Sequence, residues 1–255
     1  MKAAFPLLVT TGFFLMTLPY SGQAQTMINL ELGNNVSVSG TDSVGAVPGV
    51  GWQEVSGFPN FTNVNLDFDD GSSSGATATL TGSNGNRTSL VNTAVNTPDS
   101  IMFERGFRID DTPNSEMSFS GLPTTGDFAA GYDVYFYFDY DAASVDDTAT
   151  LGASDGTTTF YHSNNPNTTG SLFTGSYIQT TSTDSLNPSA IGNYVLFSGL
   201  SGASQTFSFD IDVDNTYLIT GAQFVAVPEP STAGLVSIAL LGLLARRRYR
   251  DQPHS

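Results

Sequence analysis

Aromatic and acidic side chains alternate between Gly131 and Asp141 in a pattern that could bind sugars. Phenol rings offer a stacking surface for a sugar ring, and neighbouring carboxylates accept hydrogen bonds from its hydroxyls. On the two-residue period of a strand, one face carries Tyr132, Val134, Phe136, Phe138 and Tyr140, and the other carries Asp133, Tyr135, Tyr137, Asp139 and Asp141. The second face is therefore predicted to bind carbohydrate through Tyr135, Tyr137, Asp133 and Asp139. The alternative is a central strand covered on both faces, with the tyrosine hydroxyls bonded internally.

Trp52 is the only tryptophan of the chain, and it follows Gly51. An indole on a loop is a common surface for stacking sugars, so Trp52 is predicted to be a further carbohydrate-binding residue. The alternative is that its large side chain closes one end of the fold.

Asp210, Asp212 and Asp214 have the odd-numbered spacing with which calcium loops present their carboxylates. The sixth position of such a loop would be Asn215 instead of glycine, and the twelfth would be Gly221 instead of glutamate, which excludes an EF-hand. A looser calcium site at the three aspartates is predicted, and no other cofactor is expected. The alternative is that strand carboxylates keep a secreted sheet soluble and its edges unpaired.

Catalytic machinery has little support in the sequence. The chain has no cysteine, which excludes a thiol nucleophile, disulfides and cysteine zinc sites. Apart from His254, the only histidine is His162, which is expected at the surface, and no Gly-x-Ser-x-Gly motif is present. We therefore expect that the protein is not an enzyme. The alternative is a secreted glycan-active hydrolase or lyase, because paired carboxylates are sufficient for glycoside cleavage.

Between residues 25 and 226, short runs of alternating apolar and polar residues are separated by turn-forming residues. This period of two is typical of strands, and no segment of helical period lies between the two ends. Strands are expected at residues 28–32, 63–69, 76–81, 101–109 with a break at Gly106, 116–120, 132–141, 157–162, 177–180, 194–197, 207–214 and 217–227. The sequence thus predicts one all-β domain, a two-sheet sandwich that is jelly-roll-like, with a closed barrel as the alternative.

This domain is strongly acidic. It holds 22 of the 24 acidic residues of the chain but only three of the eight basic ones, Arg87, Arg105 and Arg108. Such a surface repels nucleic acid and anionic lipid. We therefore expect no nucleic-acid partner.

The N-terminal end has the pattern of an export signal. Lys2 precedes an apolar stretch that ends at Leu18, and Gly22-Gln23-Ala24 is a small-x-small cleavage site. Residues 1–24 are therefore predicted to be a signal peptide that the Sec translocon receives, with Gln25 as the first residue of the mature protein. A permanent N-terminal anchor is the alternative.

Residues 227–255 combine three features in a fixed order. Pro228, Glu229 and Pro230 come first, an apolar segment at residues 231–245 follows, and a basic tail at residues 246–250 ends the series. Prolines interrupt strands and helices, and arginines beside an apolar segment are typical of the cytoplasmic side of a membrane. With 15 residues, the apolar segment is shorter than the roughly 20 that span a bilayer comfortably, so it is predicted to be a marginal membrane helix.

This order resembles the PEP-CTERM signal of Gram-negative bacteria. The resemblance implies that a membrane-embedded cysteine protease, an exosortase, recognises Pro228, Glu229 and Pro230, and that Arg246, Arg247 and Arg248 stop transfer through the membrane. It implies export, transient anchoring in the inner membrane, and a final place at the cell surface or outside the cell, often beside exopolysaccharide. An ordinary C-terminal anchor after a proline-rich linker is the alternative. We therefore expect an exported, non-enzymatic protein that binds polysaccharide or forms part of the extracellular matrix.

Overall fold

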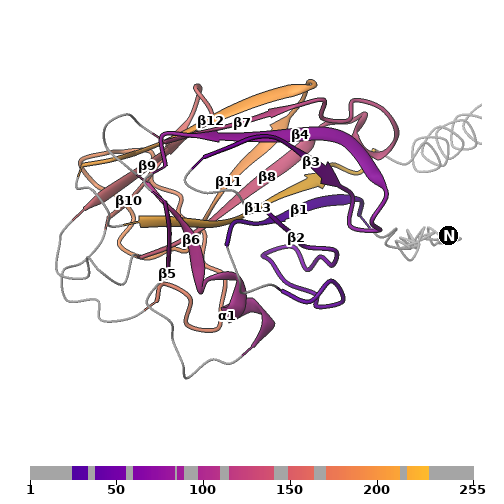
Figure 1. The fold of residues 1–255 in the computed structure, drawn as a ribbon. Coiled ribbons are helices and arrows are strands. Elements are labelled where there is room, and N and C mark those ends of the chain that lie inside the picture. The colour runs from indigo at the N-terminus through magenta and orange to yellow at the C-terminus, as the bar shows by residue number, and fades with distance from the viewer. Residues whose placement is uncertain are drawn as a thin grey trace, which may run out of the picture.

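The computed structural model describes residues 25–33, 38–55, 60–83, 85–88, 97–109, 115–140, 149–163, 171–212 and 217–229. These residues form two β-sheets that pack face to face (Figure 1). The predicted all-β, two-sheet sandwich is thereby confirmed. No helix among the described residues is long and apolar enough to cross a membrane. The predicted signal peptide and the apolar segment at residues 231–245 lie outside the described residues.

One sheet has seven strands, and β13 is at its centre. On one side β13 pairs along its length with β8, and on the other side it pairs first with β6 and then with β1. The strand order is β11, β8, β13, β1, β2, with β5 beside β6, and every pair is antiparallel except β1 with β2. The bounds are β1 (Met27–Glu31), β2 (Gln53–Glu54), β5 (Asn86–Thr88), β6 (Arg105–Arg108), β8 (Tyr132–Tyr140), β11 (Tyr194–Leu200) and β13 (Tyr217–Ala226).

The other sheet has six strands, all paired antiparallel. Their order is β10 (Thr159–Ser163), β9 (Thr150–Ser154), β12 (Ser204–Ile211), β7 (Ser115–Ser120), β4 (Ser73–Thr81) and β3 (Phe61–Asp67). Exposed and buried residues alternate along β7 and along most of β4 and β12, as expected for a sheet with one face toward water.

The core lies between the two sheets and is rich in phenylalanine. Phe136 on β8 is at its centre, with its ring centroid 4.7 Å from that of Phe207 and 5.1 Å from that of Phe209, both on β12. The first of the two faces distinguished along this strand points into the core, because all its members belong to this buried cluster: Tyr132, Val134, Phe136, Phe138 and Tyr140.

A second buried cluster covers the outer face of the seven-stranded sheet. Segment 38–55, the short helix α1 (Pro98–Met102) and the segment that begins at Ser171 lie over this face. We call this group the outer cluster; its buried members are Met27, Val38, Val44, Trp52, Met102, Phe103, Tyr135, Tyr137, Phe173 and Val225. The seven-stranded sheet is therefore covered on both sides, whereas the six-stranded sheet is covered on one.

Two segments differ from the predicted strands. Residues 101–109 do not form one strand, because Thr97 caps the helix α1 and strand β6 starts only at Arg105. Thr97 and Ser100 form a capping box, and Pro98 occupies the first turn, where its missing N–H is not needed. A helix of five residues is too short to show a period, so only this start signal could have revealed it. Residues 177–180 contain an isolated bridge from Gln179 to Tyr194 instead of a strand.

Candidate functional site

The tyrosines of the predicted sugar-binding face are covered by the outer cluster. Tyr137 is fully buried, and Tyr135 is only 9 % exposed. The Tyr137 hydroxyl donates to Gln223 Oε1 at 2.9 Å and accepts from Ala46 N at 2.9 Å. Burial raises the pKa of Tyr137 well above its ordinary value. The expectation of an exposed tyrosine surface is therefore wrong, and the alternative of a strand covered on both faces holds.

Trp52 is part of the same cluster and is not on an exposed loop. It is 6 % exposed, its Nε1 donates to Gly49 O at 2.9 Å, and its ring meets the Tyr137 ring edge to face at 6.0 Å. Gly45 sits close by with φ at +109°, and a Cβ there would come within 3.1 Å of both the Trp52 ring and the Tyr137 hydroxyl. The two aromatic residues hold segment 38–55 on the sheet and present no stacking face to solvent.

The two aspartates predicted beside these tyrosines also have structural partners. Asp133 is half-buried, and its Oδ1 accepts from Gly199 N at 2.8 Å. Asp139 is fully buried and accepts from Tyr140 N at 2.8 Å, from Leu172 N at 2.7 Å and from the Ser171 hydroxyl. A carboxylate that receives this many internal hydrogen bonds fastens the segment after Ser171 to β8 and cannot face a ligand.

The predicted calcium ligands are only partly described. Asp210 and Asp212 lie exposed at the end of β12, and Asp212 Oδ1 accepts from Thr150 N at 2.6 Å. Asp214 lies outside the described residues. Within the described ranges, no three histidine or acidic side chains gather as a metal site would require. Calcium binding at these three aspartates stays a prediction.

His162 lies in the interior, contrary to the expectation of a surface residue. It is 1 % exposed, and its Nδ1 is 2.8 Å from the Tyr217 hydroxyl. Burial lowers its pKa to about 4, so the imidazole is neutral at neutral pH. A side chain in this position contributes to packing among Phe138, Tyr140 and Tyr217.

The described residues form a pocket of about 460 Å³ at one end of the sandwich. Three connections meet there: the residues before β1, the turn between β3 and β4, and the segment between β7 and β8 that contains the short helix η1 (Gly126–Phe128) (Figure 1). We call it the end pocket; it is lined by Gln25, Thr26, Phe68, Asp69, Asp70, Ser72, Thr125, Gly126, Asp127 and Phe128. No sequence pattern predicted it, because its residues come from three distant segments.

The β3–β4 turn has a local reason for its shape. Asp70 accepts from Ser72 N at 2.8 Å and from Ser72 Oγ at 2.6 Å, and Gly71 takes a φ of +80° that other residues avoid. The two hydrogen bonds from Ser72 lower the pKa of Asp70. Asp69 N donates to Met27 O at 2.9 Å, which ties the turn to β1. The turn therefore presents Phe68, Asp69 and Asp70 in a defined arrangement.

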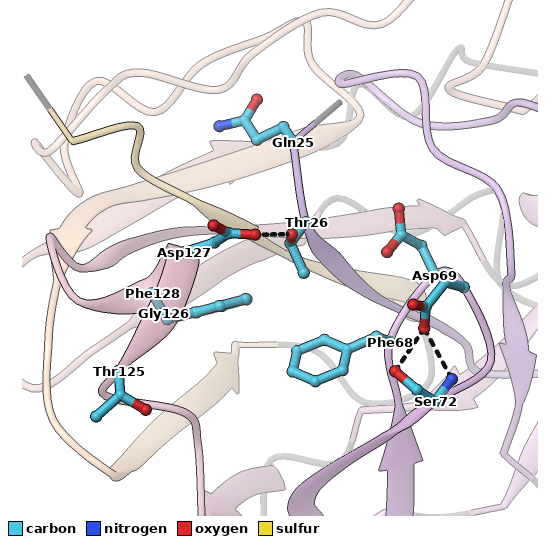
Figure 2. Close-up of a pocket in the computed structure, with 10 residues that line it drawn as sticks. Gln25, Thr26, Phe68, Asp69, Ser72, Thr125, Gly126, Asp127 and Phe128 are labelled. Atoms are coloured by element: carbon cyan, nitrogen blue, oxygen red, sulfur yellow. Dashed lines mark hydrogen bonds between the residues drawn. The ribbon is translucent and has the colours of Figure 1, made fainter. Parts of the chain in front are cut away.

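Figure 2 shows how the side chains share the end pocket. The Phe68 ring is half-buried and lies 6.0 Å from the ring of buried Phe128, at a tilt of 43°. On the opposite wall, the Thr26 hydroxyl donates to an Asp127 carboxylate oxygen. The lining of the pocket thus combines two aromatic rings with carboxylates and hydroxyls. This combination can stack a flat apolar surface and accept hydrogen bonds from hydroxyl groups.

The C-terminal end of β13 leaves the fold beside this pocket. Ala226 N donates to Thr26 O at 3.1 Å, and the Gln25 side chain donates to Ala226 O. Val227 N donates to Gly131 O at 3.0 Å, and Pro228 and Glu229 are exposed. The remaining predicted sorting residues, Pro230, Arg246, Arg247 and Arg248, lie outside the described residues.

Residues 226–248 match the family model of the PEP-CTERM protein-sorting motif. The match begins at Ala226, the last residue of β13, so the motif joins the fold without a linker. The chain therefore carries this sorting motif, as predicted. Such a motif implies a protein that is exported and that an exosortase processes for display at the cell surface. No curated protein and no solved structure matches the chain.

Proposed function

We propose that this exported sandwich is a non-catalytic binding protein of the cell surface or extracellular matrix, and that its end pocket binds a polysaccharide chain. The observation that carries the proposal is the half-buried Phe68 ring, which lies among carboxylates and hydroxyls in a pocket of about 460 Å³. Stacking on the ring would supply the apolar contact, and Asp69 and Asp127 would accept hydrogen bonds from sugar hydroxyls.

Charge narrows the class of polysaccharide. The pocket lining contains three aspartates and no basic residue, and the domain around it is strongly acidic. A carboxylated or sulfated polymer would meet like charges at short range, with no cation to offset them. The proposed ligand is therefore a neutral or amino-substituted polysaccharide.

The route to the surface completes the proposal. The predicted signal peptide, residues 1–24, would deliver the chain to the Sec translocon, and residues 231–245 would hold it in the inner membrane until an exosortase acts. The sorting motif supports this order of events. Exopolysaccharide is then the polymer that the released domain would meet.

Replacement of Phe68 by alanine tests the pocket. Binding of the processed protein to a panel of neutral glucans, galactans and mannans should weaken by about 1 kcal/mol, or about fivefold in Kd, because one stacking contact is lost. Isothermal titration calorimetry on the best-bound glycan measures the change. Alginate, an anionic polymer, should bind more weakly than the neutral glycans.

The matched control is Phe160→Ala. Phe160, on β10, is also half-buried, but its ring packs against Phe197 on β11 and does not line the end pocket. The variant should leave glycan affinity unchanged. Equal losses in both variants, or no glycan binding at all, would remove the end pocket as a binding site and favour a matrix component that binds no sugar. Release of reducing ends from a bound glycan, abolished by Asp127→Asn, would instead favour the hydrolase alternative.

A further inference from the structure

Two tyrosine rings lie side by side where the seven-stranded sheet ends. Tyr135 on β8 and Tyr194 on β11 are diagonal neighbours, because Tyr194 pairs with Tyr137 and Leu196 pairs with Tyr135. Their ring centroids are 5.9 Å apart at a tilt of 37°, within the range of contacting aromatic pairs. We call Tyr135 and Tyr194 the phenol pair. It connects β11, the outermost strand of this sheet, to the strand beside it.

The hydroxyls of the phenol pair differ from those of the neighbouring tyrosines. The Tyr137 and Tyr177 hydroxyls both donate to side chains of the fold. Within the described part of the chain, the hydroxyls of Tyr135 and Tyr194 have no hydrogen-bond partner. Tyr194 is half-buried, and the Tyr135 hydroxyl is not one of the fully buried polar atoms that lack a partner, so part of it reaches solvent. Both phenols are therefore open to reagents from solution.

A second pair of tyrosines shows why this exposure matters. The rings of Tyr140 and Tyr217 are closer together, at 5.3 Å, but both side chains are buried between the sheets. The Tyr217 hydroxyl is also hydrogen-bonded to His162. Contact between rings is thus found at both pairs, whereas access from solution is found at the phenol pair.

We propose that the phenol pair is a site of oxidative cross-linking, at which a peroxidase with hydrogen peroxide joins the two rings by a carbon–carbon bond. The oxidant removes a hydrogen atom from Tyr194, the more exposed phenol, and the radical passes to Tyr135 by exchange of a hydrogen atom. A second oxidation of Tyr194 leaves two radicals in contact. Their ortho carbons form the bond, and the hydrogen on each of these carbons moves to oxygen and restores the phenol. One hydrogen peroxide takes up the two hydrogen atoms removed and becomes two molecules of water.

Three properties of the chain favour a link within one molecule. Two rings held in contact couple faster than rings on separate molecules, because no association step is needed. The domain holds 22 acidic and three basic residues, so copies of it repel one another. Burial raises the pKa of both phenols, so each keeps its proton at neutral pH until it is oxidised. In a chain without cysteine, this bond would supply the covalent fastening that disulfides give other exported proteins.

Peroxidase treatment of the full chain, kept soluble by detergent, tests the proposal. Hydrogen peroxide and a haem peroxidase should produce dityrosine fluorescence in the monomer band of a denaturing gel. Mass spectrometry of a digest should find the loss of two hydrogen atoms in a linked peptide pair that contains Tyr135 and Tyr194. The yield per chain should not change when the protein is diluted, because the coupling is intramolecular.

Phenylalanine variants test which residues form the link. Tyr135→Phe and Tyr194→Phe should each lose the linked product, and both should melt close to the wild-type temperature, because neither hydroxyl has a partner to lose. Tyr161→Phe is the matched control, since Tyr161 is also half-buried but lies on β10 in the other sheet. This variant should keep the full yield.

Several results would overturn the proposal: a link that maps to other tyrosines, fluorescence confined to covalent dimers, or oxidation of the phenol pair without coupling. Persistence of the product in either phenylalanine variant would also contradict it. Mapping of the wild-type link decides the matter even if a variant fails to fold. The experiment involves no glycan, so its outcome is independent of what the end pocket binds.

Discussion

Phe136→Ala is expected to lower the free energy of unfolding by about 3 to 5 kcal/mol, the usual range for loss of a fully buried phenylalanine. The reason is its position, because this one side chain joins both sheets. Its ring contacts Phe119 on β7, Phe207 and Phe209 on β12, and Phe197 on β11. Four aromatic neighbours from three strands cannot all close around an alanine, so a cavity would remain.

Urea unfolding of the processed protein, followed by the fluorescence of Trp52, measures this change. Trp52 is the only tryptophan and is buried in the outer cluster, so it reports on a different part of the fold from the mutated core. Phe160→Ala serves as the comparison, because its ring is half-buried and should lose less than half as much stability. If the two variants lost equal stability, Phe136 would not hold the central position that its contacts indicate.

Glu31→Gln is expected to stabilise the protein by about 2 kcal/mol at pH 8 and to have little effect below pH 4.5. Glu31 lies on β1 and is 2 % exposed. Burial raises its pKa from 4.5 to about 7, and the charges of Glu54 and Glu104 add to the effect. The hydrogen bond from Val38 N to Glu31 Oε2, 2.9 Å long, acts in the opposite direction and is retained by a glutamine oxygen.

The direction in which stability changes with pH follows from the number of protons that the folded and unfolded states bind. Between pH 4.5 and about 7 the folded state holds a proton on Glu31 that the unfolded state has released, so the wild type loses stability as the pH rises through this range. The glutamine variant does not titrate, and its advantage should grow from pH 4.5 to 7 and then stay constant. His162, with its pKa lowered to about 4, acts in the opposite sense below pH 6.5, but it is present in both proteins and cancels in their difference.

Urea unfolding at several pH values between 4.5 and 8 checks this prediction. Glu116→Gln, on the exposed face of β7, is the matched control and should bring no comparable gain. A stability difference between Glu31→Gln and the wild type that does not change with pH would contradict the protonation of Glu31 in the folded state.

The sorting signal and the strands of the domain are both encoded by residues that are neighbours in the chain. The sequence by itself therefore determined both. The sorting motif is a run of neighbouring residues, and its match starts at Ala226 with no structure needed to find it. The alternation in β7 and β12 predicted these strands to within a few residues, because a sheet face in contact with the core selects apolar side chains every second position. The bounds expected for β8 and β13 also agree to within one residue, although both strands are buried on both faces. The helix α1 and the short strands β2, β5 and β9 were not predicted, because a few residues do not establish a period.

Which strand faces are covered, and where a pocket forms, was decided only by the tertiary structure. Tyr137 has the same neighbours in sequence whether it binds a sugar or an internal glutamine, and the outcome depends on Ala46 and Phe103, which belong to distant segments that fold over it. Its strand carries aromatic rings on both faces, but the second face also carries Asp133 and Asp139, so the sequence left both a covered face and an exposed one open. The end pocket likewise joins Thr26, Phe68 and Asp127. Contacts between residues so far apart in the chain arise from the packing of the two sheets, and no local pattern encodes them.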